Sequence, residues 1–218
     1  MGRWEPDARG RLARAALELY AETGYEQTTV ADIAVRAGVT ERTFFRYFVD
    51  KREVLFDGSG ELQRRVLDGV TAAPASLTPV DAVARAFEGA ASLLAERRDL
   101  SRHRAATIAA NPSLQERELL KFAGLGASVA DALRSRGVAE PAATLAAETG
   151  VTIFRVGFEK WIAGSPGDLA QCIRETLAEL KSLTGAARRS HPAGLRTPRA
   201  DRAVLGRPRR PGEGARHG

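Results

Sequence analysis

The sequence predicts an all-α protein of about nine helices, and three observations support this fold class. Up to residue 184, apolar residues recur three and four positions apart in almost every segment, as they do along one face of a helix. These segments lack the alternating β-branched runs, bounded by turns, that are typical of strands. Short polar caps are also followed three residues later by an acid that can reach back to the cap. Four such boxes pair Thr29 with Asp32, Asp50 with Glu53, Thr78 with Asp81 and Ser165 with Asp168.

The caps and the periodicity together place the elements in order along the chain. We expect helices at residues 6–23, 29–37, 41–48, 51–72, 79–97, 99–110, 112–136, 141–163 and 166–184. Pro79, Pro112 and Pro166 stand at first helical positions, where a missing N–H costs nothing. Residues 185–218 are rich in Arg, Pro and Gly with scarcely any large apolar residue, so we expect a disordered tail.

The formal charge of +6 is unevenly distributed along the chain. Residues 185–218 contain nine arginines and two acids, a net charge of +7, so the other 184 residues carry −1. The basic character is therefore weak evidence about the folded part. Cys172 is the only cysteine, which excludes an intramolecular disulfide and favours a cytoplasmic location. The N-terminus alternates charged and apolar residues, so we expect neither a signal peptide nor a membrane span.

Two short helices joined by a glycine turn are predicted at residues 29–48. The first buries one stripe, and Gly38 supplies the left-handed residue that ends it before Thr40 caps the second. The stripe consists of Val30, Ile33, Ala34 and Ala37. The helix at residues 6–23 closes a three-helix core through a stripe of its own, made of Leu12, Ala15, Ala16, Leu19 and Tyr20. This is the pattern of a helix-turn-helix with a three-residue turn, and it defines a domain at residues 1–50.

The helix at residues 41–48 has two chemically different sides. At 100° per residue, Phe44 and Phe48 fall on one side, and Arg42 and Arg46 fall on the other. Arginine can grip guanine through two hydrogen bonds in the major groove, whereas hydroxyls, helix N-termini and lysine hold phosphates. We therefore predict that double-stranded DNA contacts Thr29, Thr40, Glu41, Arg42, Thr43, Phe45, Arg46, Tyr47 and Lys51.

The motif from Thr28 to Leu55 reads T-T-V-x-x-I-A-x-x-A-G-V-T-x-x-T-F-F-x-Y-F-x-x-K-x-x-L. It resembles the N-terminal DNA-binding domain of the TetR family of transcriptional repressors over about residues 8–55. Members of that family commonly have tyrosine where this chain has Phe45, so a phosphate contact through that hydroxyl is absent here. The segment E-R-T-F-F-R-Y-F, with W-E-P upstream, also resembles the mycofactocin-associated regulators. This second resemblance implies an acyl-thioester-like effector.

Residues 51–184 are expected to form a helical domain that binds a small molecule and dimerises. Apolar residues and two polar anchors are candidate walls of an effector pocket: Phe87, Leu94, His103, Arg104, Ile108, Phe122, Phe154 and Phe158. For the aromatic positions, core packing or a dimer seam is the favoured alternative. For His103, the alternative is an exposed histidine among arginines.

The resemblance implies that the last two helices pair with those of a second copy to form a homodimer. Glycines on one stripe would let another helix approach closely, and apolar residues would fill the seam. The candidate interface is Gly150, Gly157, Trp161, Leu169, Ile173 and Leu177.

Little in the sequence indicates an enzyme, because it contains no nucleophile elbow, no Walker loop and no set of metal ligands at a suitable spacing. His103, His191 and His217 are scattered, so we predict neither an enzyme nor a metal site, and no cofactor besides an effector. The sequence predicts a repressor that binds a palindromic operator as a homodimer and responds to a ligand. Two alternatives stay open: a constitutive DNA-binding protein that uses the Arg-rich tail, and an enzyme or helical small-molecule carrier.

Overall fold

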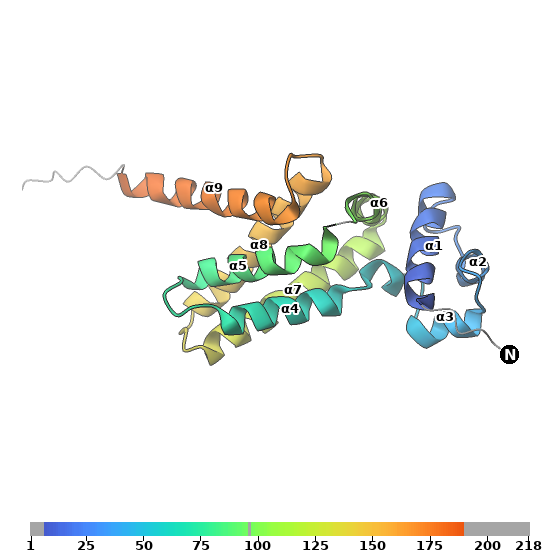
Figure 1. The fold of residues 1–218 in the computed structure, drawn as a ribbon, viewed down its shortest axis with the longest axis horizontal. Coiled ribbons are helices and arrows are strands. Elements are labelled where there is room, and N and C mark those ends of the chain that lie inside the picture. Colours follow the sequence, from blue (N-terminus) through green and yellow to red (C-terminus); the bar gives the residue numbers. More distant parts are fainter. Residues whose placement is uncertain (1–6, 96, 190–218) are drawn as a thin grey trace, which may run out of the picture.

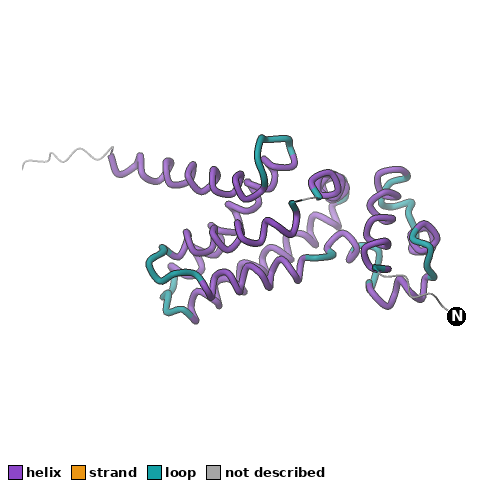
Figure 2. Tube along the Cα trace, in the orientation of Figure 1, coloured by secondary structure: helices purple, strands orange, loops and turns teal. Residues whose placement is uncertain are grey.

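The computed structural model describes residues 7–95 and 97–189. Every regular element within these ranges is a helix, which confirms the predicted fold class (Figure 2). The N-terminal unit contains α1 (Ala8–Glu22), α2 (Val30–Arg36) and α3 (Glu41–Tyr47). A 3₁₀ turn, η1 (Glu53–Phe56), then leads into the C-terminal domain.

The C-terminal domain is a helical bundle with two flanking helices. The bundle consists of α4 (Ser59–Ala72), α5 (Pro79–Ala90), α7 (Pro112–Ser135) and α8 (Ala142–Ile162). A 3₁₀ turn, η2 (Ala91–Leu94), follows α5; α6 (Arg98–Ala109) reaches from the bundle to α1, and α9 (Leu169–Arg189) packs on α5 and α8. In Figure 1 the N-terminal unit lies at one end of an elongated molecule, and α6 lies between it and the bundle.

Two hydrophobic clusters hold these parts together. The larger one fills the bundle and the contact with α9. The smaller one joins α1, α2, α3 and η1, and it also includes Ile108 from α6 and Leu114 from α7. The N-terminal unit is therefore seated on the C-terminal domain through shared apolar packing, since Leu114 is fully buried and Ile108 is 2% exposed.

The helix predicted at residues 51–72 is wrong as a single element. Gly58 has a φ of 84°, in the left-handed region that ends regular helices, and α4 starts only at Ser59. The cap at Asp50 exists, because its Oδ1 accepts the N–H groups of Arg52 and Glu53 at 2.8 and 3.1 Å. Glu53 does not complete the box, since its carboxylate instead reaches α7.

The helix predicted at residues 79–97 is also divided, because α5 ends at Ala90 and becomes the 3₁₀ turn. The helix predicted at residues 166–184 begins later and ends later. Gly167 has a φ of 87°, and Asp168 is the cap, its Oδ1 accepting the N–H of Gln171 at 2.7 Å. The helix continues to Arg189, so residues 185–189 do not belong to the predicted tail. The rest of that tail, residues 190–218, lies outside the described residues.

Candidate nucleic-acid interface

The first two helices are joined by a polar clamp on their outer side. Arg36 of α2 donates two hydrogen bonds, of 3.0 and 2.7 Å, to the two carboxylate oxygens of Glu22 on α1. Thr29 caps α2 as predicted, with its Oγ1 accepting the N–H of Asp32 at 3.1 Å and Asp32 accepting the Thr29 N–H at 2.9 Å. Hydrogen bonds lower the pKa of both carboxyls, Glu22 through Arg36 and Asp32 through Thr29. The end of α2 is thus tied to the end of α1, and the start of α2 is capped by its own residues.

The turn between α2 and α3 matches the predicted helix-turn-helix. Gly38 has a φ of 69°, which suits glycine, and the N–H of Val39 donates to Ala34 O at 2.9 Å. Thr40 then caps α3, because its Oγ1 accepts the N–H of Thr43 at 3.2 Å. The capping residues of both helices, Thr29 and Thr40, are exposed, and so is Glu41.

The two sides of α3 are divided as the sequence predicts. Phe44 is fully buried and Phe48 is 4% exposed, with ring centroids 5.5 Å apart. Arg42 and Arg46 are exposed, and Phe45 has 55% of its surface accessible. The buried rings set the rotation of α3 about its axis, so the guanidinium side of the helix faces outward.

Arg46 is held in place by its neighbour on the surface. Its guanidinium lies 4.8 Å from the centroid of the Tyr47 ring, and its Nη2 donates to the Tyr47 hydroxyl at 2.9 Å. Arg42 has no ion pair or hydrogen bond to any residue that the structure describes. The two cations therefore differ, because Arg46 is oriented on an aromatic face whereas Arg42 is an open donor.

Lys51 lies in a different setting from the one predicted for a phosphate contact. Its ammonium nitrogen donates to the backbone oxygens of Tyr25, Glu26 and Thr28 at 2.8, 3.2 and 3.0 Å. An ammonium has three N–H donors, so these carbonyls occupy all of them. All three donors of Lys51 are thus engaged within the protein in this structure, and its contact with a DNA phosphate stays a prediction.

The aromatic residues of the predicted effector pocket pack against one another. The rings of Phe87 and Phe154 are stacked with centroids 4.8 Å apart, and Phe122 and Phe158 lie 6.3 and 6.0 Å from Phe154. Phe87 and Phe154 are buried, whereas Phe122, Phe158 and Leu94 are half-buried at the edge of the same cluster. The structure brings these four phenylalanines and Leu94 into one packed group, the aromatic cluster.

The other three predicted pocket residues lie outside this cluster. His103 is exposed on α6, as its alternative reading held. Arg104 donates to Leu55 O at 2.5 Å and pairs with Glu118 at 3.0 Å, and burial lowers its pKa against the effect of Glu118. Ile108 belongs to the smaller cluster with the N-terminal unit. Arg104 and Ile108 therefore join the two domains instead of lining a pocket.

The predicted dimer residues are used within the chain. A Cβ on Gly150 would lie 2.1 Å from Val83 Cγ1, and one on Gly157 would lie 3.1 Å from Ile173 Cα, so both glycines allow α8 to approach its own neighbours. The remaining predicted residues are buried or half-buried in the bundle cluster: Trp161, Leu169, Ile173 and Leu177. These six residues therefore pack against other helices of the same chain, and their part in a dimer interface stays a prediction.

Ion pairs that the sequence analysis did not predict connect the N-terminal unit to the bundle. The carboxylate of Glu53 accepts from Arg117 at 2.9 and 2.8 Å and from Lys121 at 3.3 Å. Arg9 of α1 reaches Asp57 at 2.6 Å. The paired residues are separated by 48 to 68 positions in the sequence. No local sequence pattern predicts such pairs, so they are recognised only in the folded structure.

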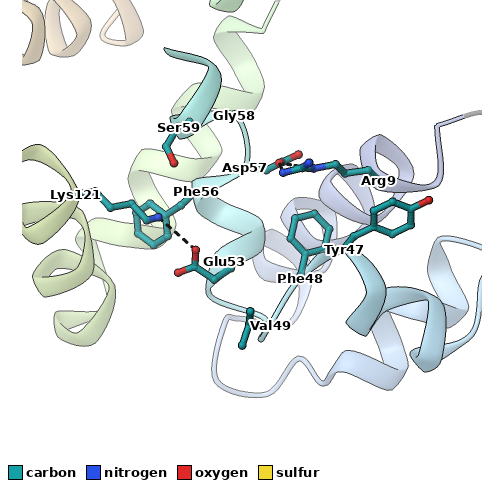
Figure 3. Close-up of a pocket in the computed structure, with 11 residues that line it drawn as sticks. Arg9, Tyr47, Phe48, Val49, Glu53, Phe56, Asp57, Gly58, Ser59 and Lys121 are labelled. Atoms are coloured by element: carbon teal, nitrogen blue, oxygen red, sulfur yellow. Dashed lines mark hydrogen bonds and ion pairs between the residues drawn. The ribbon is translucent and has the colours of Figure 1, made fainter. Parts of the chain in front are cut away.

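A pocket of about 190 Å³ lies at this junction. Residues 47–49 and 56–60 line it together with Arg9, Glu53 and Lys121. Figure 3 shows the Glu53–Lys121 pair beside Phe56 and the Arg9–Asp57 pair beside Phe48. A second, open pocket of about 660 Å³ lies on the outer side of α4 and α5 and is lined by Arg64, Arg65 and Arg85 among small residues. Neither pocket is lined by the aromatic cluster.

None of the described helices combines the length and apolarity that crossing a bilayer demands. Within residues 7–95 and 97–189, no group of three or more His, Cys, Asp or Glu side chains is arranged to hold a metal ion.

Both the N-terminal unit and the C-terminal domain of this chain are similar to known protein families. Residues 12–57 match the family of bacterial regulatory proteins called the tetR family, and residues 77–184 match the family described as the MftR C-terminal domain. The chain is 40% identical over 79 residues to the HTH-type transcriptional regulator TcmR of Streptomyces glaucescens. It is 46% identical over 45 residues to the fatty acid metabolism regulator protein of Bacillus subtilis.

These curated relatives are matched over only part of their length. The aligned region spans 36% of this chain and 35% of TcmR, and 21% of this chain and 23% of the Bacillus subtilis protein. Among solved structures, the transcriptional regulator FadR from Bacillus subtilis in complex with stearoyl-CoA superimposes with a TM-score of 0.54 at 22% identity. That superposition covers 78% of this chain and 96% of FadR, and it supports the same fold.

Proposed function

Since this chain belongs to the TetR family of DNA-binding transcription regulators, which are not enzymes, we propose that it is a ligand-responsive repressor that binds a palindromic operator as a homodimer. The observation that carries the DNA-binding part is the orientation of α3. Phe44 and Phe48 are buried while Arg42, Phe45 and Arg46 are exposed. A recognition helix needs an anchored back and a front with cationic donors for base edges.

The proposed homodimer uses exposed faces of α8 and α9. Leu145 and Val156 on α8 are 63% and 37% exposed, and Leu183 on α9 is 66% exposed. The two helices are neighbours, so their outer faces can pair with the same faces of a second copy around a twofold axis. Two helix-turn-helix units would then meet half-sites about 34 Å apart.

In this proposal α6 transmits changes from the bundle to the N-terminal unit. At its start, Arg98 donates to Trp161 O at 2.7 Å and to Ser165 O at 2.6 Å, which ties α6 to the end of α8. Farther along α6, Arg104 donates to Leu55 O of η1, and Ile108 belongs to the cluster shared with the N-terminal unit. A displacement of the corner between α8 and α9 would therefore move the reading helices and change their spacing.

The proposed effector is a small, predominantly apolar molecule that enters the aromatic cluster. Phe122 and Phe158 are half-buried at its edge, so their side chains can turn away at lower cost than those of Phe87 and Phe154. Acyl thioesters are the first class to test, because the FadR of the same fold was crystallised with stearoyl-CoA. An effector shifts the equilibrium only if it binds the form that releases DNA more tightly.

A constitutive DNA-binding protein without an effector is the second candidate. The observation that favours it is the close ring packing of Phe87, Phe122, Phe154 and Phe158, together with pockets that lie elsewhere. In that case DNA binding would be unchanged by every compound tested.

Footprinting on the promoter beside the coding region of this protein, with and without long-chain acyl-CoA, tests the proposal. We expect two protected half-sites with a common sequence, and loss of protection when the effector is added. Uniform protection of unrelated DNA would exclude sequence-specific binding. A palindromic footprint that no acyl-CoA or free fatty acid alters would favour the constitutive candidate.

A further inference from the structure

Lys51 lies at the centre of contacts that join three segments of the N-terminal unit. It follows the end of α3 by four positions, and its own backbone oxygen accepts the Tyr20 hydroxyl of α1 at 2.7 Å. Burial raises the pKa of Tyr20, which keeps the hydroxyl protonated as a donor. The side chain of Lys51 extends in another direction, to the turn between α1 and α2.

The turn between α1 and α2 has carbonyl groups that no helix satisfies. Thr28 Oγ1 donates to Gly24 O at 2.8 Å, and the Lys51 ammonium donates to the oxygens of Tyr25, Glu26 and Thr28. The same ammonium lies 4.4 Å from the centroid of the Tyr25 ring. Three carbonyl oxygens and an aromatic face thus form a cage for one compact cation.

The cage acts directly on the part of the chain that starts α2. Thr28 is 2% exposed, and Thr29, the next residue, is the cap of α2. Since buried carbonyl groups require partners, removal of the ammonium would release the turn that sets where α2 begins. The position of α2 in turn sets the position of α3 through the Gly38 turn.

We propose that Lys51 is a positioning residue that preorganises the helix-turn-helix, and that it does not bind a DNA phosphate. It holds α1, the turn at residues 25–28 and the chain after α3 in one arrangement. The inference rests on the proposed function for its effect on operator affinity. The cage itself is a property of the free protein and can be tested without DNA.

Lys51→Met and Lys51→Arg separate this role from a phosphate contact. Arginine is at least as good as lysine for phosphate, but its planar guanidinium does not match three carbonyls around a point charge. We expect both variants to lose about tenfold or more in operator affinity, because hydrogen bonds from a charged group are lost. The dependence of log K on log salt should stay unchanged, whereas loss of one phosphate contact would reduce the slope by about 0.9.

Arg85→Met is the matched control for loss of one positive charge, because Arg85 is exposed on α5, outside the N-terminal unit and on neither of the proposed dimer helices. It should leave both the operator affinity and the salt slope unchanged. The proposal is overturned if Lys51→Arg binds like the native chain while Lys51→Met shows a smaller salt slope.

Chemical rescue provides a test that holds even when a variant folds poorly or the operator is unknown. In Lys51→Ala, propylammonium chloride should raise the melting temperature of the full chain relative to sodium chloride at equal ionic strength, and propanol should not. An equal effect of propylammonium on the native chain and on Lys51→Ala would overturn the cage. Failure of the native chain to prefer any operator would instead contradict the proposed function and leave the rescue result standing.

Discussion

At the scale of single residues, the recognition surface depends on which side chains are anchored and which are open. Phe44 and Phe48 are anchored in the smaller cluster, so Arg42 and Arg46 are presented by a helix whose rotation is fixed. Tyr47 adds a second constraint by holding the Arg46 guanidinium through its ring and its hydroxyl. An oriented arginine loses less side-chain entropy on binding than a free one, so Arg46 is the better candidate for base recognition.

Arg46→Ala should therefore weaken operator binding and relax the preference at one base step. We expect a loss of about 1–3 kcal/mol, the range for one bidentate contact to guanine. Tyr47→Phe is the matched variant, because it keeps the ring and removes only the hydroxyl that accepts from Arg46. Gel-shift titrations on operator and scrambled DNA provide the measurement. An equal loss of affinity for both DNAs would show that Arg46 does not read bases.

At the scale of elements, the helices of the bundle approach one another where side chains are smallest. Gly150 lies against Val83 of α5 and Gly157 against the backbone of α9. Sequence spacing correctly marked these glycines as sites of close helix approach, but it did not tell whether the approaching helix belongs to the same chain. Val83 is fully buried, so it has little room to yield to a larger neighbour.

Gly150→Ala should destabilise the folded protein by about 1–3 kcal/mol through overpacking. Gly124 is the matched control, because it lies on the exposed side of α7 and a Cβ there meets nothing within 4 Å. Gly124→Ala should stabilise the protein by about 0.5–1 kcal/mol through helix propensity. Urea unfolding midpoints measure both effects. A Gly150→Ala variant as stable as the native chain would contradict the close approach.

The clamp between α1 and α2 should weaken in acid. Hydrogen bonds lower the pKa of Glu22 below its ordinary 4.5 and that of Asp32 below 3.8. The folded state then binds fewer protons than the unfolded state, so the stabilisation is present above these ordinary values and is lost as pH falls through the lowered ones. The protection factors of the α2 amides, which correct for the slower intrinsic exchange in acid, should be lower at pH 3 than at pH 5. In a Glu22→Gln, Asp32→Asn double variant, the difference in α2 protection between these pH values should shrink; an undiminished difference would exclude these carboxyls as its source.

At the scale of the whole molecule, the chain has two cores connected by a charged joint. Ile108 and Leu114 extend the smaller core into the C-terminal domain, and Glu53 binds both Arg117 and Lys121 of α7. The joint lies between the proposed effector site and the recognition helix. In the proposed mechanism, α6, α7 and η1 therefore transmit effector binding to the recognition helix.

The proposed homodimer predicts the effect of a charge on the outer face of α8. Val156→Glu should produce a monomer, because two buried carboxylates would face each other across the twofold axis without partners. Leu119→Glu on α7 is the control, since Leu119 is 58% exposed and lies on neither dimer helix. Light scattering after size-exclusion chromatography measures the mass, and footprinting measures operator occupancy. A dimeric Val156→Glu variant would place the interface elsewhere.

The sequence alone determined the fold class, the helix-turn-helix and the two sides of α3, because these depend on local periodicity, caps and a glycine turn. Tertiary structure decided the roles of Lys51, Arg104, Ile108 and the glycines of α8. Each of these depends on a partner far along the chain, and local spacing contains no information about which distant surface a side chain will meet. The spacing of apolar residues and glycines on α8 predicted that another helix packs against it, but only the packed fold identified α5 and α9 of the same chain as the partners.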